Sequence, residues 1–301
     1  MEQHRKAIIW MILACLGASI MVAIIGHLTR AEPAMHPFQV VFLRNIFALI
    51  FFMPWIIKIW RRQNNFVHLK TTQIKLHAIR VVLGLIAMYF WFFSLAVVPH
   101  PTAVALSFTS PLITAVLAVF LLQDRFGWHK GVALVCGFVG AIVILRPGME
   151  GFNQYGWMVL VAAALWSGVG IIIKRLTLKD SPQLVAFYMV LVGIPLTLPL
   201  AIIYWQPVSL VTWGWVLLLG FVSVEFQVAM NKAFSLAPFS VILPFDFTRL
   251  IFTSILSYFL FSELIDLWTF VGAVLIMASA VYATWRQAKK DKQAKQKKCS
   301  S

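Results

Sequence analysis

Long apolar runs separated by short polar connections recur along the whole chain of 301 residues. A helix rises 1.5 Å per residue, so about 20 apolar residues cross the roughly 30 Å hydrocarbon core of a bilayer. Ten segments fit this description, at residues 7–28, 37–59, 76–98, 101–122, 128–145, 155–173, 183–205, 210–230, 241–261 and 267–285. The pattern predicts an all-α, polytopic membrane protein with ten transmembrane helices.

Composition supports a lipid environment, because only 12% of the residues are charged and 61% are apolar. Soluble domains carry about 25% charged residues. The formal charge of +15 lies in short segments between apolar runs, which argues against a basic face that binds nucleic acid. Cys15 and Cys136 lie inside apolar runs, so no disulfide framework is expected. The first run lacks a cleavage site and is predicted to be retained as a helix.

The distribution of basic residues predicts the orientation. If the N-terminus is cytoplasmic, 20 of the 25 Lys and Arg residues fall on the cytoplasmic side, and the outer loops hold only Arg30 and Arg146. This is the asymmetry that cytoplasmic loops show in membrane proteins. We therefore expect a multi-pass protein of the cytoplasmic (inner) membrane with both termini cytoplasmic.

The two halves of the chain resemble each other. Phe-Ser-Leu-Ala occurs at residues 93–96 and again at 234–237, and Phe108-Thr109 aligns with Phe247-Thr248 at an offset of 139. We expect one repeat at 7–147, a second at 155–285, and a disordered basic tail at 286–301 that contacts anionic lipid. Five helices per repeat is an odd number, so the second repeat enters the membrane inverted. Inverted repeats are typical of secondary transporters, which open a central site to alternate sides.

Several motifs make the chain similar to the EamA-type members of the drug/metabolite transporter superfamily. They are residues 109–113 (Thr-Ser-Pro-Leu-Ile), Asp124, Gly131 and residues 137–140 in the first half, and residues 243–263 in the second. Asp124 departs from the glutamate that many first repeats carry. The resemblance covers nearly all of the chain except the tail. It implies a central cavity lined by helices 1–4 and 6–9, with helices 5 and 10 peripheral, and a small-molecule substrate.

Four charged residues lie inside predicted spans, where a charge costs at least about 2.5–3.5 kcal/mol on insertion scales. Asp246 and Arg249 are three residues apart, so they either neutralise each other or contact a ligand. Arg44 is expected to bind a carboxylate or to gate, the alternative being a buried pair with an acid of the other half. Glu225 is either a proton carrier or cation site, or it meets water or Lys232 near the end of its helix.

Aromatic side chains crowd several spans, and Trp91 and Trp166 are the candidates for a planar or cationic ligand because both lie well inside their spans. Most such aromatics fill a core or face lipid. Arg80 is close enough to the basic side to act as an anchor. Small residues at 133, 137 and 141 allow close helix packing, within one chain or in a homodimer.

These patterns favour a secondary transporter over two rivals. An intramembrane enzyme would need a metal motif or a nucleophile with a base, and a channel would need a filter or a ring of like charges. No cofactor or metal is predicted. An S-adenosylmethionine-like or other amino-acid-like solute is favoured, since mixed charges with aromatics match a zwitterionic, partly aromatic molecule and since the second and ninth spans resemble S-adenosylmethionine carriers of this family. Export of riboflavin, amino acids or cationic drugs is the alternative.

Overall fold

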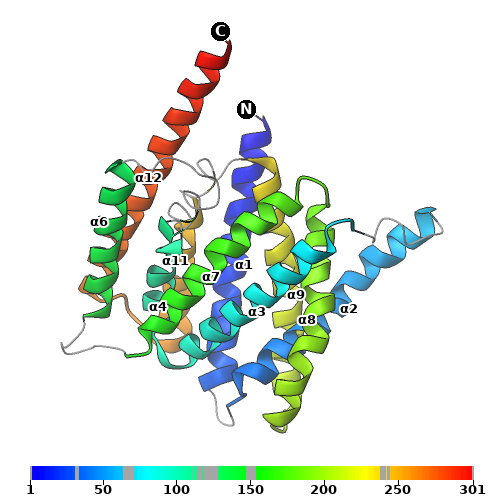
Figure 1. Ribbon diagram of the computed structural model, residues 1–301. Coiled ribbons are helices and arrows are strands. Elements are labelled where there is room, and N and C mark those ends of the chain that lie inside the picture. Colours follow the sequence, from blue (N-terminus) through cyan, green and yellow to red (C-terminus); the bar gives the residue numbers. More distant parts are fainter. Residues whose placement is uncertain are drawn as a thin grey trace.

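The computed structural model describes residues 2–30, 34–63, 71–110, 112–113, 117, 128–146, 154–237, 242 and 245–299. In this part of the chain the regular structure is helical throughout, and no strand occurs. The helices (Figure 1) are α1 (Glu2–Arg30), α2 (Pro37–Gln63), α3 (Ile74–Val97), α4 (His100–Ser107), α6 (Trp128–Leu145), α7 (Gly156–Leu176), α8 (Pro182–Ile203), α9 (Leu210–Leu236), α11 (Thr248–Phe261) and α12 (Leu267–Cys299).

The predicted all-α polytopic architecture is confirmed. Six helices in the described residues are long and apolar enough to cross a membrane, namely α1, α2, α3, α7, α8 and α9, and shorter apolar helices lie at Val135–Leu145, Thr248–Phe261 and Leu267–Tyr282. Large apolar side chains such as Phe138, Leu210 and Phe259 are exposed, whereas Arg44 and Arg80 are almost completely buried. This distribution is the one that a hydrocarbon solvent stabilises.

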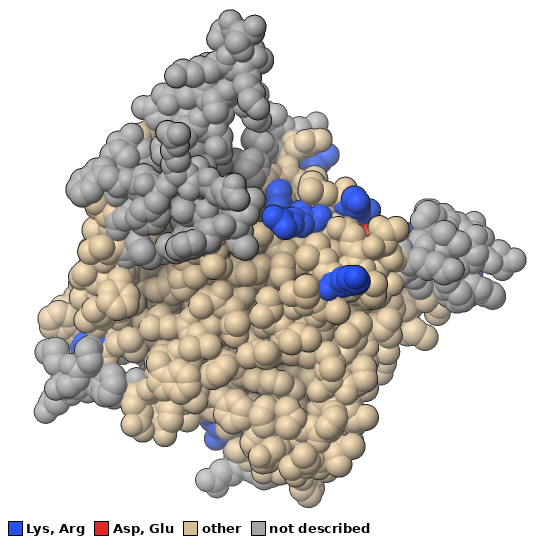
Figure 2. All heavy atoms as spheres, viewed as in Figure 1, with Lys and Arg blue, Asp and Glu red and all other residues tan. Residues whose placement is uncertain are grey.

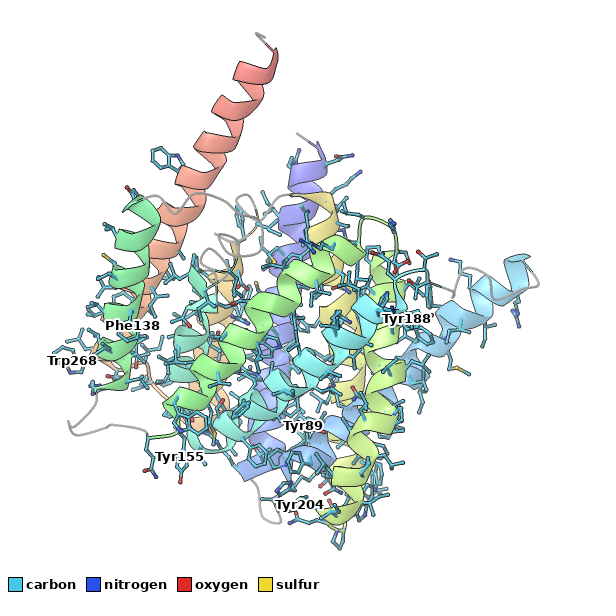
Figure 3. The ribbon with its side chains drawn as sticks, in the orientation of Figure 1. Tyr89, Phe138, Tyr155, Tyr188, Tyr204 and Trp268 are labelled. Carbon is cyan, nitrogen blue, oxygen red and sulfur yellow. The ribbon has the colours of Figure 1, made fainter. Side chains whose placement is uncertain are left out.

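Charged side chains are unevenly distributed over the surface of the bundle (Figure 2). On the face shown in Figure 2, Lys and Arg gather toward the end of the bundle at which both chain ends lie (Figure 1), and a broad zone without visible charge crosses the middle. We call this end the terminal end and the opposite one the distal end. Tyr155 and Tyr204 lie at the distal end, while Phe138 and Trp268 project outward from α6 and α12 (Figure 3). Exposed Tyr and Trp near span ends match the interfacial belt of membrane proteins.

Helix contacts come in pairs that interchange when the two halves of the chain are exchanged. α1 packs on α9 as α3 packs on α7, and α1 packs on α11 as α7 packs on α4. Two further contacts, α2 with α8 and α6 with α12, join helices at matching places in the two halves. The core of the bundle is therefore formed between the halves more than within either one.

Two predicted spans are interrupted instead of continuous. α4 ends at Ser107, and the backbone turns at Phe108 and Thr109. α11 begins only at Thr248, after a turn at Phe247. Pro111 carries no N–H and cannot bond to the carbonyl of Ser107, which is a chemical reason for the first break. Phe108 and Phe247 meet edge to face with ring centroids 4.9 Å apart, so the two breaks touch.

Two further predictions concern the C-terminal tail and the small residues of α6. The tail was predicted to be disordered, but α12 continues as a helix through Cys299 and extends beyond the bundle (Figure 1). Ala, Gln, Lys and Arg are good helix formers, and no Gly or Pro interrupts residues 286–299. Gly137 of α6 packs inside the chain, since a Cβ there would meet Leu112 and Ser279. A homodimer stays a prediction.

Candidate functional site

A cavity of about 180 Å³ lies inside the bundle, bounded mainly by α1, α3, α7 and α9. This is many times the space that one water molecule needs. α7 and α9 contribute only from their C-terminal halves, at 166–173 and 226–234, so the cavity extends from the centre toward the terminal end. Much of its wall is flexible and apolar, with the thioethers of Met11, Met21, Met88, Met189 and Met230. Methionine adapts to irregular ligands because its side chain is unbranched and polarizable.

Five of the six predicted site residues line this cavity: Arg44, Trp91, Trp166, Asp246 and Arg249. They come from four helices and from the break before α11. Trp91 and Trp166 face each other across the contact of α3 with α7, with ring centroids 5.3 Å apart and ring planes inclined by 59°. Two indoles at this spacing form an aromatic wall.

Glu225 is the exception. It is exposed on the outer face of α9, and the described lining contains its neighbours Phe226 and Gln227 but not Glu225. Phe221 and Leu218, one and two turns earlier, are exposed on the same face. A helix turns by 100° per residue, so a rotation that points residues 226 and 227 inward points residue 225 away. The prediction that Glu225 lies on the cavity is therefore corrected.

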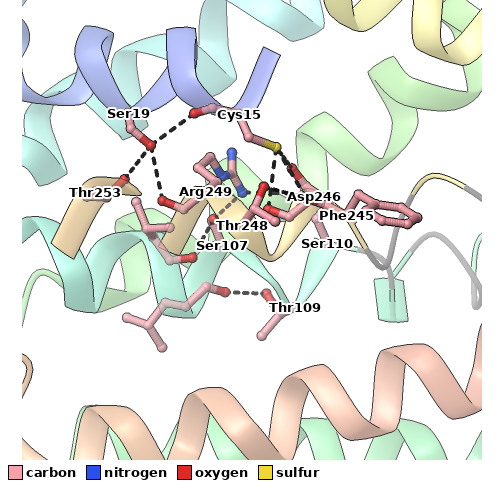
Figure 4. Close-up of polar contacts among 12 residues, drawn as sticks. Cys15, Ser19, Ser107, Thr109, Ser110, Phe245, Asp246, Thr248, Arg249 and Thr253 are labelled. Atoms are coloured by element: carbon pink, nitrogen blue, oxygen red, sulfur yellow. Dashed lines mark hydrogen bonds and ion pairs between the residues drawn. The ribbon is translucent and has the colours of Figure 1, made fainter. Parts of the chain in front are cut away.

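Asp246 and Arg249 form a long ion pair, with Arg249 Nη2 3.8 Å from the carboxylate of Asp246. The same Nη2 donates a hydrogen bond of 2.9 Å to Ser107 Oγ, and the guanidinium carbon lies 5.2 Å from the ring centre of Phe108 (Figure 4). The thiol of Cys15 lies 3.6 Å from Asp246 Oδ1. The pair thus binds both α1 and α4 while its polar atoms stay on the cavity.

Arg44 has very little protein to bind. The residue is 2% exposed, and among the described residues it donates one hydrogen bond, of 2.7 Å, from Nη2 to Oδ1 of the adjacent Asn45. Among the described residues no carboxylate lies within 4.0 Å of it. The predicted alternative, a buried pair with an acid of the other half, is not found in this part of the chain.

Arg80 was missed as a site residue. It is 1% exposed and lines the cavity, so the anchor predicted at the basic end of the span is wrong. Its Nη1 donates to the carbonyl of Val185 at 2.9 Å and its Nη2 to Gln227 Oε1 at 3.3 Å. One signal in the sequence pointed inward: Gly84, one turn later on the same face, opens space that the cavity uses.

Two serines tie the helix crossings beside the cavity. Ser19 of α1 donates to the backbone carbonyl of Arg249 at 3.1 Å, and Ser167 of α7 donates to the carbonyl of Ser110 at 2.8 Å. Residues 110 and 249 are separated by the repeat offset of 139. The two bonds therefore occupy matching places in the two halves.

Basic side chains hold two further helix ends in matching ways. Arg30 donates to the carbonyls of Leu95 and Val98 at the end of α3, at 3.0 and 2.6 Å. Lys174 donates to the carbonyls of residues 234 and 237 at the end of α9. A cation at a helix C-terminus satisfies free carbonyls and complements the helix dipole.

At the distal end, an acidic residue joins the contact that Arg30 makes with the end of α3. There Glu263 pairs with Arg30 and accepts the backbone N–H of His100 at 2.9 Å. Asp124, which aligns with Glu263 at the repeat offset, lies outside the described residues. Among the described residues, no group of three or more His, Cys, Asp or Glu side chains could hold a metal ion.

Comparison with known proteins agrees with this geometry. A model of the EamA-like transporter family matches residues 5–146 and 155–285. The S-adenosylmethionine uptake transporter of Rickettsia bellii (strain RML369-C) is 30% identical over 292 residues, covering 96% of this chain and 97% of that protein. The counterpart from Rickettsia prowazekii (strain Madrid E) is 29% identical, covering 96% of both. The riboflavin transporter of Vibrio cholerae serotype O1 (strain ATCC 39315 / El Tor Inaba N16961) is 28% identical, covering 94% of both.

A solved structure shares the fold. A protein crystal structure matches 92% of this chain and 98% of its own chain, with a TM-score of 0.61 at 17% identity. At this identity the likeness concerns the fold alone.

Proposed function

The chain belongs to the EamA-like transporter family, and from this premise we propose that it is a secondary transporter that moves a small metabolite through the central cavity by alternating access. The observation that carries the proposal is the cavity itself, in which buried charges and two indoles from both halves of the chain face one space. Arg44, Asp246, Arg249, Trp91 and Trp166 are the proposed binding residues.

Alternating access would use two inverted units, residues 7–147 and 155–285. Support comes from helix contacts that interchange when the halves are exchanged, and from the matching bonds of Ser19 and Ser167. Two units that pack on each other in interchangeable ways can trade conformations, and a site between them then faces each side in turn.

The cavity reaches toward the terminal end, while the Arg30–Glu263 pair ties the distal end. With the termini in the cytoplasm of a cell bounded by an inner membrane, this conformation is open toward the cytoplasm. For proton-coupled transport, Asp246 is the proposed proton carrier. It is the one carboxylate among the described lining residues, whereas Glu225 does not line the cavity.

An S-adenosylmethionine-like or other amino-acid-like solute is the proposed substrate. The names of the rickettsial relatives support it, as does a cavity with both signs of charge beside aromatic rings. Riboflavin is the second candidate, favoured by the Vibrio relative and by the facing indoles of Trp91 and Trp166.

Counterflow in proteoliposomes tests the function. Vesicles loaded with unlabelled S-adenosylmethionine or riboflavin are expected to accumulate the same labelled solute transiently, and excess unlabelled solute outside should abolish this accumulation. A carrier gives saturable exchange, whereas single-channel currents would indicate a pore. Chemical conversion without translocation would indicate an enzyme. Absence of counterflow for both solutes would contradict the proposed substrates.

A further inference from the structure

The described lining of the cavity is unbalanced in charge. It contains three guanidinium groups, from Arg44, Arg80 and Arg249, and one carboxylate, from Asp246. Asp246 is paired with Arg249, so Arg44 and Arg80 are left without a countercharge among the described residues. Burying a cation without a countercharge costs desolvation free energy, so a compensating negative charge is expected at the site.

The two uncompensated arginines differ in how well the protein binds them. Arg80 donates from both terminal nitrogens to acceptors on α8 and α9, which fixes its orientation. Arg44 donates only to the side chain of its own neighbour, Asn45, among the described residues, and the buried Nε is without a partner in both arginines. Within the described part of the chain, Arg44 thus keeps the greater part of its five N–H donors free while it faces a cavity.

We propose that Arg44 is the receptor for an anionic group, specifically a carboxylate, on the transported solute. A planar guanidinium binds a carboxylate through two parallel hydrogen bonds, and this supplies the charge and the acceptors that Arg44 lacks. A phosphate dianion would call for more donors at one place, and Arg80 is already engaged. The inference rests on the proposed function, because it names the chemical class of solute for that same cavity.

The rest of the solute is expected to be largely apolar or aromatic. Around the charges the wall is largely apolar, with methionines, small aliphatic side chains and aromatic rings that include Trp91, Trp166 and Phe226. Such a wall binds a flat or branched apolar body through dispersion and stacking, and it gives a hydrophilic anion few partners. The preferred solute therefore carries a carboxylate at one end of a bulky body.

Sodium acetate tests the anion site without knowledge of the substrate. We expect acetate to raise the melting temperature of the purified full-length protein in a saturable way, relative to sodium chloride at equal ionic strength and to acetamide. R44Q should lose this shift, and R175Q, a change to an exposed arginine at the end of α7, should keep it. Without acetate, R44Q should melt no lower than the unmodified protein, because it removes an uncompensated buried charge.

No acetate shift in the unmodified protein, or an equal shift in R44Q, would overturn the proposal. So would a larger shift with sulfate or phosphate than with acetate. R44K keeps the charge without the planar fork and should keep a smaller shift, which decides the matter if R44Q does not fold.

A matched pair of solutes tests the substrate class. S-adenosylmethionine should bind about 10- to 100-fold more tightly than its decarboxylated analogue, and R44Q should abolish the difference. Equal binding of both would refute the carboxylate assignment and leave the transporter proposal standing. If neither binds while acetate still acts through Arg44, the proposed substrate fails and the anion site stands.

Discussion

The crossing of α1 with α11 and the crossing of α7 with α4 use the same backbone bond but different side chains. Ser19 binds the carbonyl of residue 249 and Ser167 binds the carbonyl of residue 110. The second half has Arg249 where the first has Ser110, and Asp246 where the first has Ser107. The scaffold is thus repeated and the charge is not. Since the neutral crossing forms without an ion pair, the crossing itself does not require the charges, which is consistent with the proposed role of Asp246 and Arg249 toward the solute.

Removing the charge from the second half tests this comparison most directly. D246S/R249S gives both crossings the same neutral residues and should lower counterflow about 100-fold, because the solute loses charge-assisted contacts. The double variant should also be more stable than D246S alone, which leaves the partly buried Arg249 without its ion-pair partner. Initial rates in proteoliposomes and melting temperatures in detergent measure the two effects. Near-normal counterflow would show that the charges serve only the crossing.

The two matching helix-end contacts differ as well, since the contact of Arg30 includes Glu263. E263Q should weaken the distal end and shift the population toward a conformation open on that side, with about a threefold change for a loss of 0.6 kcal/mol. In a C136S/C299S background, Cys15 reports access to the cavity. A membrane-impermeant thiol reagent applied from the distal side should label it faster in E263Q. Unchanged labelling would mean that this pair does not hold the distal end shut.

The serine bonds allow a smaller test. S19A and S167A each remove the hydroxyl that ties one crossing, and each should lower stability by about 0.6 kcal/mol for every bond lost between helices, the typical value in membrane proteins. Each hydroxyl also contacts one further hydroxyl, because Ser19 accepts from Thr253 at 2.9 Å and Ser167 shares a bond of 3.0 Å with Ser110, so the two losses should be similar. Denaturation of the purified variants measures both. A loss confined to one variant would show that the crossings are not energetically alike.

Glu225 should give the smallest effect. E225Q is expected to change counterflow by less than about twofold, because the side chain is exposed on the outer face of α9 and does not touch the solute. A loss comparable to that of D246S/R249S would restore the proton-carrier hypothesis. The pH dependence of counterflow in E225Q and in the unmodified protein separates a coupling role from a structural one.

Sequence reasoning succeeded where the solvent decides the outcome. Lipid requires long apolar helices, so the element types follow from hydropathy alone. It failed where the rotation of a helix about its axis determines which side chains face the cavity. Glu225 and Phe226 are neighbours in the sequence, and only packing determines which of them faces the cavity. The prediction for Arg80 was wrong for the same reason. Its distance from the end of the span is compatible both with an anchor at the membrane surface and with a buried side chain.

The helix interruptions at Phe108 and Phe247 could not be predicted from hydropathy either. Hydropathy counts residues and does not detect a turn inside an apolar run, although Pro111 and Pro244 stand near the two turns. The charged residues gave better information. Of the four intramembrane charges singled out, Arg44, Asp246 and Arg249 line one cavity, because burying a charge demands a polar environment that a bundle provides in few places.

The glycines of α6 and α12 have a mechanical consequence. A Cβ on Gly140 would come within 2.9 Å of the carbonyl oxygen of Gly272, and a Cβ on Gly272 within 2.6 Å of that of Gly140. The two backbones therefore approach closely at these glycines, where the side chains of Ile144 and Ile276 also pack. A side chain at either glycine would collide with the facing carbonyl and force the two helices apart, so the close approach of α6 to α12 depends on both residues.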